Sequence, residues 1–343
     1  MRWKIQVKNY RCFADSNPLT IDLSNPVTAL VGPNNSGKTA ALRFFWEMGR
    51  MLSQAPGALM GRDDGAGPRA ILNQNIRVLS DAYAAFTELN DRPMEVDLWQ
   101  LTNEFPRDQF GSAMTEDVLP VHIRVRFDRT NLNADVFLIH EGNEVVVHPG
   151  EFYMHSNQLG NLYVHQTEGY QYFLDHSNNL YGFDQPTFVP AVRSFGNIQI
   201  PANHELVLGQ SVITQWVTQK QADHAQARKN AASLEREIAR IFGYKQIEIN
   251  ANGRNDDLIV KINNDKSFLL KDMGNGISHF ISLLSNIPAR GNPLILIDEP
   301  EIGIHASLQV ELMNLLSKHT NGPIIFGRLS PSHTVIDSNL RKA

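Results

Sequence analysis

The stretch GPNNSGKT, residues 32–39, has glycine at its first and sixth positions, followed by lysine and threonine. Such a loop can turn its backbone N–H groups toward phosphate oxygens, while the lysine reaches the β- and γ-phosphates and the threonine hydroxyl binds Mg²⁺. The same residue pattern also occurs in a simple Gly/Asn turn, so the flanking residues must show which of the two structures it forms. VTALV before the loop predicts a buried strand, and AALRFFWEMGRML after it predicts a helix with one apolar face. This order brings a helix N-terminus to the loop, so we interpret it as a phosphate-binding loop.

A pair of acidic residues supplies the second half of such a site, in LILIDEPEIGIHASLQ at 294–309. Residues 294–297 predict a buried strand that ends in Asp298 and Glu299. An acid at the carboxyl end of such a strand can hold Mg²⁺ beside a phosphate loop, and the next carboxylate can orient or deprotonate the attacking water. The alternative is an Asp-Glu pair that caps a helix. The two halves together favour ATP hydrolysis.

A third motif, KDMGNGISHFISLL at 271–284, has a Gly-Asn-Gly turn that opens an apolar helix. The N-terminus of that helix is a second place suited to an anion. Taken alone, the turn is equally typical of an ordinary helix start.

These motifs carry a resemblance to a known family. NYRCF, GPNNSGKT, MGNGIS and IDEPEIGIHASLQ occur in the order found in SMC/RecF-type ABC ATPases. The sequence resembles in particular the branch that contains the OLD proteins and the ATPase subunits of bacterial anti-phage systems, and TFVPAVRSF (187–195) is similar to that branch's strand ending in arginine. The resemblance covers both ends of the chain and little of residues 50–185. It implies an α/β fold, an ABC-type P-loop ATPase head with a mixed central sheet and flanking helices, which carries a strand-rich insertion and a helical arm and binds ATP between two subunits.

The resemblance also implies roles for individual residues. It makes Glu299 and Lys38 catalytic, gives Mg²⁺ to Thr39 and Asp298, and makes 301–305 a turn at the dimer contact. The Gly-Asn-Gly turn becomes a signature that acts on the ATP of the other subunit. The residues expected to contact nucleotide are Asn34, Asn35, Ser36, Gly37, Lys38, Thr39, Ala40, Gly274, Asn275, Gly276 and Arg11. Tyr10 and Arg11 lie near the base and ribose in this interpretation; the alternative is that they only pack.

The sequence departs from the family after PIIF. The family continues with Thr-His-Ser-Pro, and here GRLSP places Leu329 where the histidine touches the γ-phosphate. His333 is a substitute only with a shifted loop, so we expect slow hydrolysis. The glutamine that senses Mg²⁺ is not assigned, and its candidates are Gln100, Gln158 and Gln166.

The composition limits the class of protein. With 343 residues, 42% hydrophobic and 20% charged, the chain can form one large or two ordinary domains. A net charge of −5 requires any DNA contact to be a local basic patch. Cys12 is the only cysteine, which excludes an internal disulfide and suits a reducing cytoplasm. We find neither a leader nor an apolar run of membrane-span length, and expect a soluble cytoplasmic protein.

Along the chain we expect four parts: an N-terminal part of the head (1–117), a strand-rich segment (118–195), a helical arm (196–245) and a C-terminal part of the head (246–343). A surface loop is predicted over 51–69, a helix over 71–89, a hairpin turn at EGN (141–143), and one or two helices over 208–242. The excess of Lys and Arg in 220–245 favours either a basic arm or a solvated helix face.

Histidines and arginines in the middle of the chain leave alternatives open. A metal site is conceivable, but ordinary strand histidines are favoured because no two lie at a close ligand spacing. Arg193 is expected either to contact phosphate or DNA, or to form a structural salt bridge. The histidines concerned are His122, His140, His148, His155, His165 and His176.

The function expected is that of a Mg²⁺- and ATP-dependent ATPase, a homodimer or higher even-numbered homo-oligomer. It would sense a trigger and control a separate effector, a nuclease, in phage defence or DNA maintenance, with DNA possible as a ligand and no membrane. The alternatives are a slow or non-hydrolysing ATP-gated scaffold or sensor that sequesters a partner, and a DNA-repair ATPase of RecF type.

Overall fold

The structure is a computed structural model of the chain. It describes residues 3–59, 85–101, 118–129, 134–145, 162–165, 171–174, 180–184, 186–189, 208–221, 225–255, 257–285, 294–302, 304–319 and 322–328. Statements on structure below refer to these residues.

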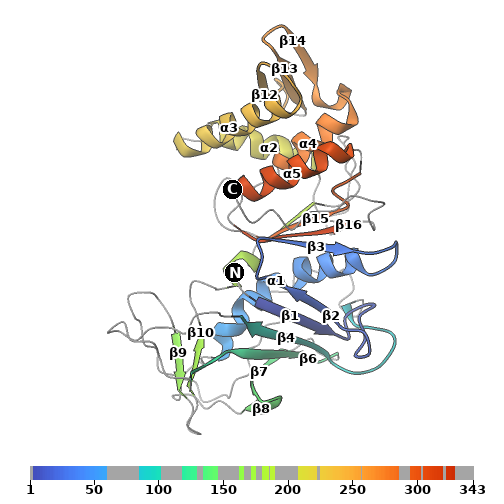
Figure 1. Cartoon of the computed structure of the whole chain (residues 1–343), viewed down its shortest axis with the longest axis vertical. Helices are drawn as coiled ribbons and strands as arrows, with labels where there is room; N and C mark the ends of the chain where they lie inside the picture. Colours follow the sequence, from blue (N-terminus) through green and yellow to red (C-terminus); the bar gives the residue numbers. More distant parts are fainter. Residues whose placement is uncertain are drawn as a thin grey trace.

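Two sheets and the helix between them form the centre of the molecule (Figure 1). The first sheet is antiparallel, in the order β2-β1-β4-β6-β7-β8, with β1 (Trp3–Lys8), β2 (Leu19–Asp22), β4 (Met94–Gln100), β6 (His122–Phe127), β7 (Ala134–His140) and β8 (Asn143–Val145). The second is parallel, in the order β11-β15-β16-β3, with β3 (Val27–Val31), β11 (Thr187–Val189), β15 (Ile295–Asp298) and β16 (Ile324–Arg328). Helix α1 (Lys38–Leu59) follows β3.

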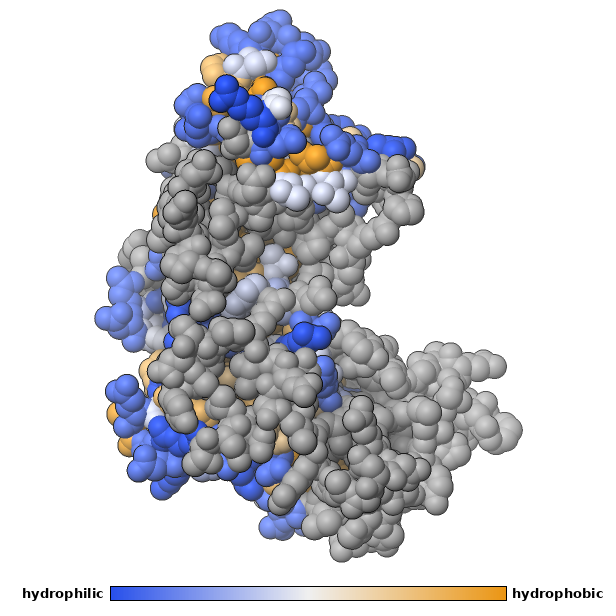
Figure 2. Space-filling model, turned by 180° about the vertical axis from the view of Figure 1, so that it is seen from behind, coloured by the Kyte–Doolittle hydropathy of each residue, from blue (hydrophilic) through white to orange (hydrophobic). Residues whose placement is uncertain are grey.

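The remaining elements lie at the two ends of the molecule. A small sheet joins β5 (Val118–Pro120), β9 (Leu162–His165) and β10 (Gln171–Leu174), and a 3₁₀ turn η4 (Leu180–Phe183) precedes β11. The other end holds β12 (Ile247–Ala251), β13 (Leu258–Ile262), β14 (Lys266–Leu269), the turn η5 (Leu270–Asp272), and helices α2 (Leu208–Gln221), α3 (Ala225–Ile241), α4 (Asn275–Ser285) and α5 (Ala306–His319). Figure 2 shows mainly hydrophilic residues over the end that carries β12–β14.

The central strand β15 of the parallel sheet is buried on both faces. Along β15, Leu294 and Leu296 belong to the core that contains α1, whereas Ile295 and Ile297 belong to the core that contains α2–α5. Neighbouring side chains of a strand point to opposite faces, so this apolar run fills two cores at once. Its continuation places Asp298 on the α1 side. The described strands and helices thus confirm the predicted α/β class, with the parallel and antiparallel strands of the centre in separate sheets.

Helix α1 is longer than predicted. The first nine residues of the expected 51–69 loop are helical, in spite of Pro56. Met51, Leu52 and Ala55 are fully buried in the core between the two sheets, and this burial extends the helix where the local Gly/Pro content indicates a loop. The part of the predicted helix at 71–89 up to residue 84 lies outside the described residues, and 85–89 is not helical.

Part of the strand-rich segment predicted from residue 118 shares a sheet with the N-terminal strands. Strand β6 pairs along its whole length with β4, so β6, β7 and β8 are the outer half of the N-terminal sheet rather than a segment apart from the head. Local alternation predicts the strands, but the pairing partner depends on residues distant in sequence. The EGN hairpin is confirmed: Glu141 and Gly142 have φ of 49° and 85° between β7 and β8.

The predicted helices over 208–242 are confirmed as α2 and α3, which pack on β12. The indole N–H of Trp216 donates to the carbonyl of Ile249 at 2.6 Å, and a carboxylate oxygen of Glu235 accepts from the amide of Ile249 and from Lys220, both at 2.7 Å. Arg240 and Lys318 also bind Glu237. These ion pairs favour the solvated-face alternative over a basic arm.

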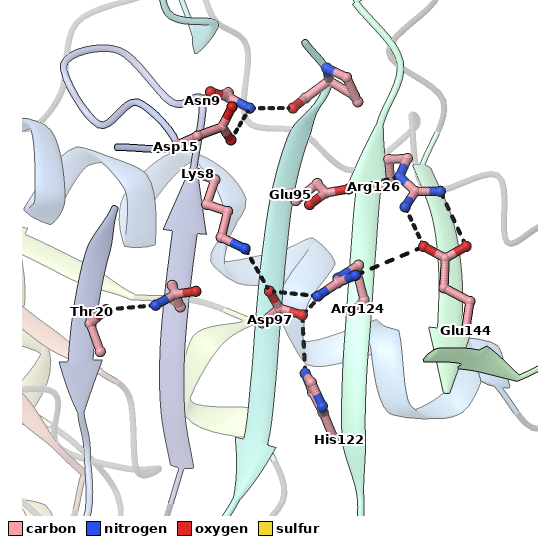
Figure 3. A network of polar contacts seen from close by, with 12 residues as sticks. Lys8, Asn9, Asp15, Thr20, Glu95, Asp97, His122, Arg124, Arg126 and Glu144 are labelled. Carbon is pink, nitrogen blue, oxygen red and sulfur yellow. Dashed lines mark hydrogen bonds and ion pairs between the residues drawn. The ribbon is translucent and has the colours of Figure 1, made fainter. Parts of the chain in front are cut away.

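A network of charged side chains ties the strands of the N-terminal sheet together on its outer face (Figure 3). Asp97 of β4, 1% exposed, accepts from His122 at 3.0 Å and from Arg124 at 2.8 Å, both on β6, and lies 3.8 Å from Lys8 of β1. Burial alone would raise the pKa of the Asp97 carboxyl, but the hydrogen bonds from His122 and Arg124 outweigh it and hold this pKa below its ordinary 3.8. Arg126 extends the network to Glu95 and Glu144.

No helix in the described part of the chain is both long and apolar enough to cross a membrane.

We predict that Asp97→Asn lowers the free energy of unfolding at pH 7 by about 2 kcal/mol, because it leaves the cations around this buried position without their counter-charge. The folded-state pKa is depressed, so the carboxylate's contribution is present above pH 3.8, the ordinary value, and is lost as pH falls through the folded pKa. Urea unfolding at pH 7 and in acid should therefore show the wild type and the variant converging at low pH.

Glu144→Gln is the control, since its partly exposed pair with Arg126 should contribute less than about 1 kcal/mol. Equal unfolding midpoints for Asp97→Asn and the wild type at pH 7 would contradict the prediction.

Candidate nucleotide site

The loop between β3 and α1 has the backbone that phosphate binding requires. Asn35 and Gly37 have φ of 62° and 91°, in the left-handed region that reverses the chain and can gather N–H groups on one side. A Cβ at Gly37 would lie 2.9 Å from both the Cys12 sulfur and the Phe13 ring, so only glycine fits there. The turn after β1 therefore packs against the loop.

Lys38 lies over this loop instead of extending into solvent. Its side chain is largely buried, and its Nζ donates to the carbonyl oxygens of Gly32 at 2.9 Å and Pro33 at 2.7 Å. An ammonium held in this place can bind an anion that enters the loop, as the sequence predicts.

The two halves of the predicted site meet at Thr39 and Asp298. The Thr39 hydroxyl donates to a carboxylate oxygen of Asp298 at 2.8 Å, across a sequence separation of 259 residues. The side-chain alternation of β15 turns Asp298 toward α1, and the parallel pairing places it beside Gly327 of β16. A hydroxyl and a carboxylate in contact are hard oxygen ligands that suit Mg²⁺, so the donor set fits that ion.

Gly327 is a site residue that the sequence reasoning missed. A Cβ at this position would lie 3.1 Å from Asp298 Oδ1 and 3.3 Å from the Cβ of Lys38. Glycine therefore gives room here for the close approach of Asp298 and Lys38, since a Cβ would be a tight contact with both. The signal was available, because a glycine inside an otherwise apolar strand indicates a close approach of the backbone.

Glu299 directly follows the strand in a strained backbone conformation. Its φ is 48°, which is unusual for a residue other than glycine. Its N–H donates to the carbonyl of Gly327 at 2.8 Å, and its carbonyl accepts from the N–H of Ile302 at 3.2 Å. These bonds hold the predicted catalytic residue at the edge of the sheet, next to Asp298.

The Gly-Asn-Gly turn lies on the other side of the parallel sheet. It begins α4, whose Ile277, Phe280 and Ile281 pack in the core opposite to the one that holds α1. Gly274 is exposed, and apart from its chain neighbours no described residue lies within 4 Å of the place of a Cβ; its carbonyl accepts from the amide and the hydroxyl of Ser278, each at 3.2 Å. The sequence motif is thus an ordered, outward-facing helix start.

Tyr10 and Arg11 form a buried cluster with Glu47 of α1. The Tyr10 hydroxyl donates to Glu47 at 2.6 Å, and Arg11 donates to the Tyr10 oxygen at 2.9 Å and to Glu47 at 2.5 Å. Burial raises the pKa of the Tyr10 hydroxyl well above its ordinary 10.0, and the charge of Glu47 raises it further, so the group stays a donor. Tyr10 is completely buried and packs, as one alternative held; contact of Arg11 with a nucleotide stays a prediction.

Other predicted residues lie elsewhere. Gln100 pairs with Trp3, at the end of β1 away from the turn that touches the phosphate loop, so it is not placed to sense Mg²⁺ there. His122 is part of the Asp97 network. In the described residues no three His, Cys, Asp or Glu side chains gather as a further metal site. Predicted residues outside the described part are Gln158, Gln166, Arg193, Leu329, His333, His148, His155 and His176.

Comparison with known proteins agrees with this geometry at the N-terminal end. Residues 1–86 match the AAA ATPase domain family. This match contains β1–β3, the phosphate loop and α1, and it stops before the acidic strand. No curated protein sequence matches the chain.

Among solved structures, the chain is similar to the SMC head domain from Thermotoga maritima, with a TM-score of 0.43, 15% identity, and coverage of 96% of this chain and 89% of that one. It is also similar to an SMC head bound to the C-winged helix domain of ScpA (0.45, 16%, 95% and 88%) and to the recombination mediator protein RecF with ATP (0.38, 12%, 96% and 94%). At these scores the likeness assigns no function, so the proposals below rest on the residues of this chain.

The contact of Cys12 with the phosphate loop gives a direct test of the site. Cys12 is exposed and is the only cysteine of the chain, so a maleimide modifies this position alone. We predict that the modified protein binds ATP at least about tenfold more weakly, a loss of about 1.4 kcal/mol, because the adduct occupies space beside Gly37. Calorimetry of ATP binding before and after modification measures this.

Cys12→Ser is the matched control and should bind ATP equally with and without the reagent. ATP should in turn slow the modification of the wild type. Full ATP affinity of completely modified protein would contradict the assignment of the loop.

Proposed function

We propose that the protein is a Mg²⁺-dependent ATPase. The observation that carries this proposal is the 2.8 Å contact between Thr39 and Asp298, which joins the phosphate loop to the acidic strand, with Lys38 on the same side. The match of residues 1–86 to an ATPase domain family supports it.

The residues have distinct roles in this proposal. The amides of residues 34–40 hold the phosphates at the start of α1, and Lys38 binds the β/γ-phosphate oxygens. Thr39 and Asp298 hold Mg²⁺, which supplies charge neutralisation on the phosphates when bound. Glu299 orients the attacking water and accepts its proton.

We further propose that two subunits close around ATP, with the α4 start of one subunit facing the phosphates of the other. Gly274 is exposed at a helix N-terminus, as such a contact needs. Two large apolar side chains that follow the acidic strand in the sequence are exposed to solvent. They are Ile302, 40% exposed, and Val310 of α5, 58% exposed. Ile302 lies in 301–305, the turn expected at the dimer contact, so its exposed side chain is available to a partner subunit.

The second candidate function is an ATP-gated sensor or scaffold that hydrolyses slowly or not at all. Leu329 favours it, because a leucine cannot donate to the γ-phosphate as the family's histidine does. Loss of one such donor costs about 10²–10³ in rate. Glu299, a carboxylate after the acidic strand, favours hydrolysis. A slow ATPase is consistent with both Leu329 and Glu299.

Glu299→Gln tests the ATPase proposal. The variant should keep ATP and Mg²⁺ binding and lose hydrolysis, because the amide cannot accept the water's proton, and light scattering should show a nucleotide-dependent closed dimer. Lys38→Ala is the comparison and should lose both binding and closure. Hydrolysis by Glu299→Gln at the wild-type rate would overturn the role of Glu299, and unchanged ATP affinity of Lys38→Ala would overturn the site.

The resemblance to ATPase subunits of anti-phage systems leads us to propose that a separate protein carries the damaging chemistry, a nuclease controlled by the state of this dimer. The purified chain should then leave plasmid DNA and tRNA intact in the presence of ATP and Mg²⁺ or Mn²⁺. Cleavage that co-purifies with the chain and disappears with a substitution in it would show that the nuclease is here.

A further inference from the structure

The turn that follows the acidic strand is held at three points by three different elements. At its start the N–H of Glu299 donates to Gly327 of β16, and at its end the carbonyl of Ile304 accepts from the side-chain amide of Gln309 of α5 at 3.1 Å. In the middle, the carbonyl of Ile302 lies 2.8 Å from Nδ1 of His279. His279 belongs to α4 and lies one helical turn after Asn275, so α4 is the third element that holds the turn.

The bond from His279 has a defined direction. A carbonyl oxygen only accepts, so Nδ1 of the imidazole must carry the proton and donate. The N–H of Ile302 is hydrogen-bonded as well, because it donates to the carbonyl of Glu299. The Ile302 backbone is therefore clamped between Glu299 and α4.

Packing holds the two ends of this turn but not its middle, because Pro300 is buried and Ile304 belongs to the core that contains α4. The Ile302 side chain is 40% exposed, and it does not belong to either hydrophobic core. Glu299 itself is in the left-handed region, a conformation that persists only where surrounding contacts enforce it. Besides the buried Pro300 and Ile304, hydrogen bonds at the turn thus hold the Glu299 backbone, and one of them comes from the helix that starts after Gly274.

We propose that His279 is a positioning residue that couples the start of α4 to the backbone of Glu299. The inference rests on the proposed function, in which Gly274–Gly276 serve the ATP of the partner and Glu299 serves the ATP of its own subunit. Engagement of the α4 start by the partner's nucleotide is then transmitted through His279 and Ile302 to the turn that presents Glu299. In this way, ATP bound to the partner affects the position of Glu299 in the subunit itself.

A matched pair of substitutions isolates the hydrogen bond. In His279→Asn the side-chain amide nitrogen takes the place of Nδ1 and can still donate, whereas His279→Leu has a methyl group there. Leucine is the better helix former of the two, so a merely structural role predicts that the leucine variant is at least as good as the asparagine variant. A positioning role predicts the reverse order.

Steady-state hydrolysis and hydrogen exchange are measured on the full chain of each variant. His279→Leu should lower kcat about fivefold, the loss expected from one ordinary hydrogen bond, with KM within about twofold of the wild type. In the absence of nucleotide, amides of the turn at 299–305 should exchange about fivefold faster in this variant. His279→Asn should restore both quantities to within about twofold.

Unchanged exchange of the turn in His279→Leu, or faster exchange with an unchanged kcat, would overturn the inference. Equal loss in the asparagine and leucine variants would also overturn it. A wild type that does not hydrolyse ATP would instead contradict the proposed function, and because the exchange comparison needs no nucleotide, it would still decide whether His279 holds the turn.

Discussion

The burial of α1 between two sheets is the constraint on which the rest of this structure depends. The helix is apolar nearly all round, with Leu42, Phe44, Phe45 and Met48 all buried, so it needs a sheet on either side to cover it. The antiparallel sheet supplies one cover and the parallel sheet the other. Because the same helix begins at the phosphate loop, the packing that satisfies its apolar surface also fixes the loop against Asp298.

The geometry of the site is set mainly by the backbone, which at a few positions passes very close to other groups. Glycine is needed at Gly37 because of its φ of 91° and the nearby ring of Phe13, and at Gly327 it gives room for the close approach of Asp298 and Lys38. Such positions allow charged groups to gather in a small space without the main chain blocking them. The sheet and the segments packed against it therefore fix the positions of the functional side chains.

Much of this was visible in the sequence, because the motif residues are flanked by short segments whose periodicity is unambiguous. VTALV and LILID predict their strands, and the acidic strand predicts the partner of the loop. What the sequence could not show is pairing between distant segments, which placed β6–β8 in the N-terminal sheet, and tertiary burial, which kept residues 51–59 helical around Pro56. The role of His279 was equally hidden, since a lone histidine on a helix gives no indication of the carbonyl it will meet.

The position of β3 at the edge of the parallel sheet has a consequence for biosynthesis. Its only strand partner in that sheet is β16, which comes from the opposite end of the described sequence. A nascent chain therefore exposes β3, and the face of α1 that packs on the parallel sheet, long before β15 and β16 leave the ribosome, a state that is slow to fold and open to aggregation or chaperone capture. Completion of the nucleotide pocket therefore waits for the synthesis of β16, so ATP can act as a ligand that selects molecules in which β16 has joined the sheet.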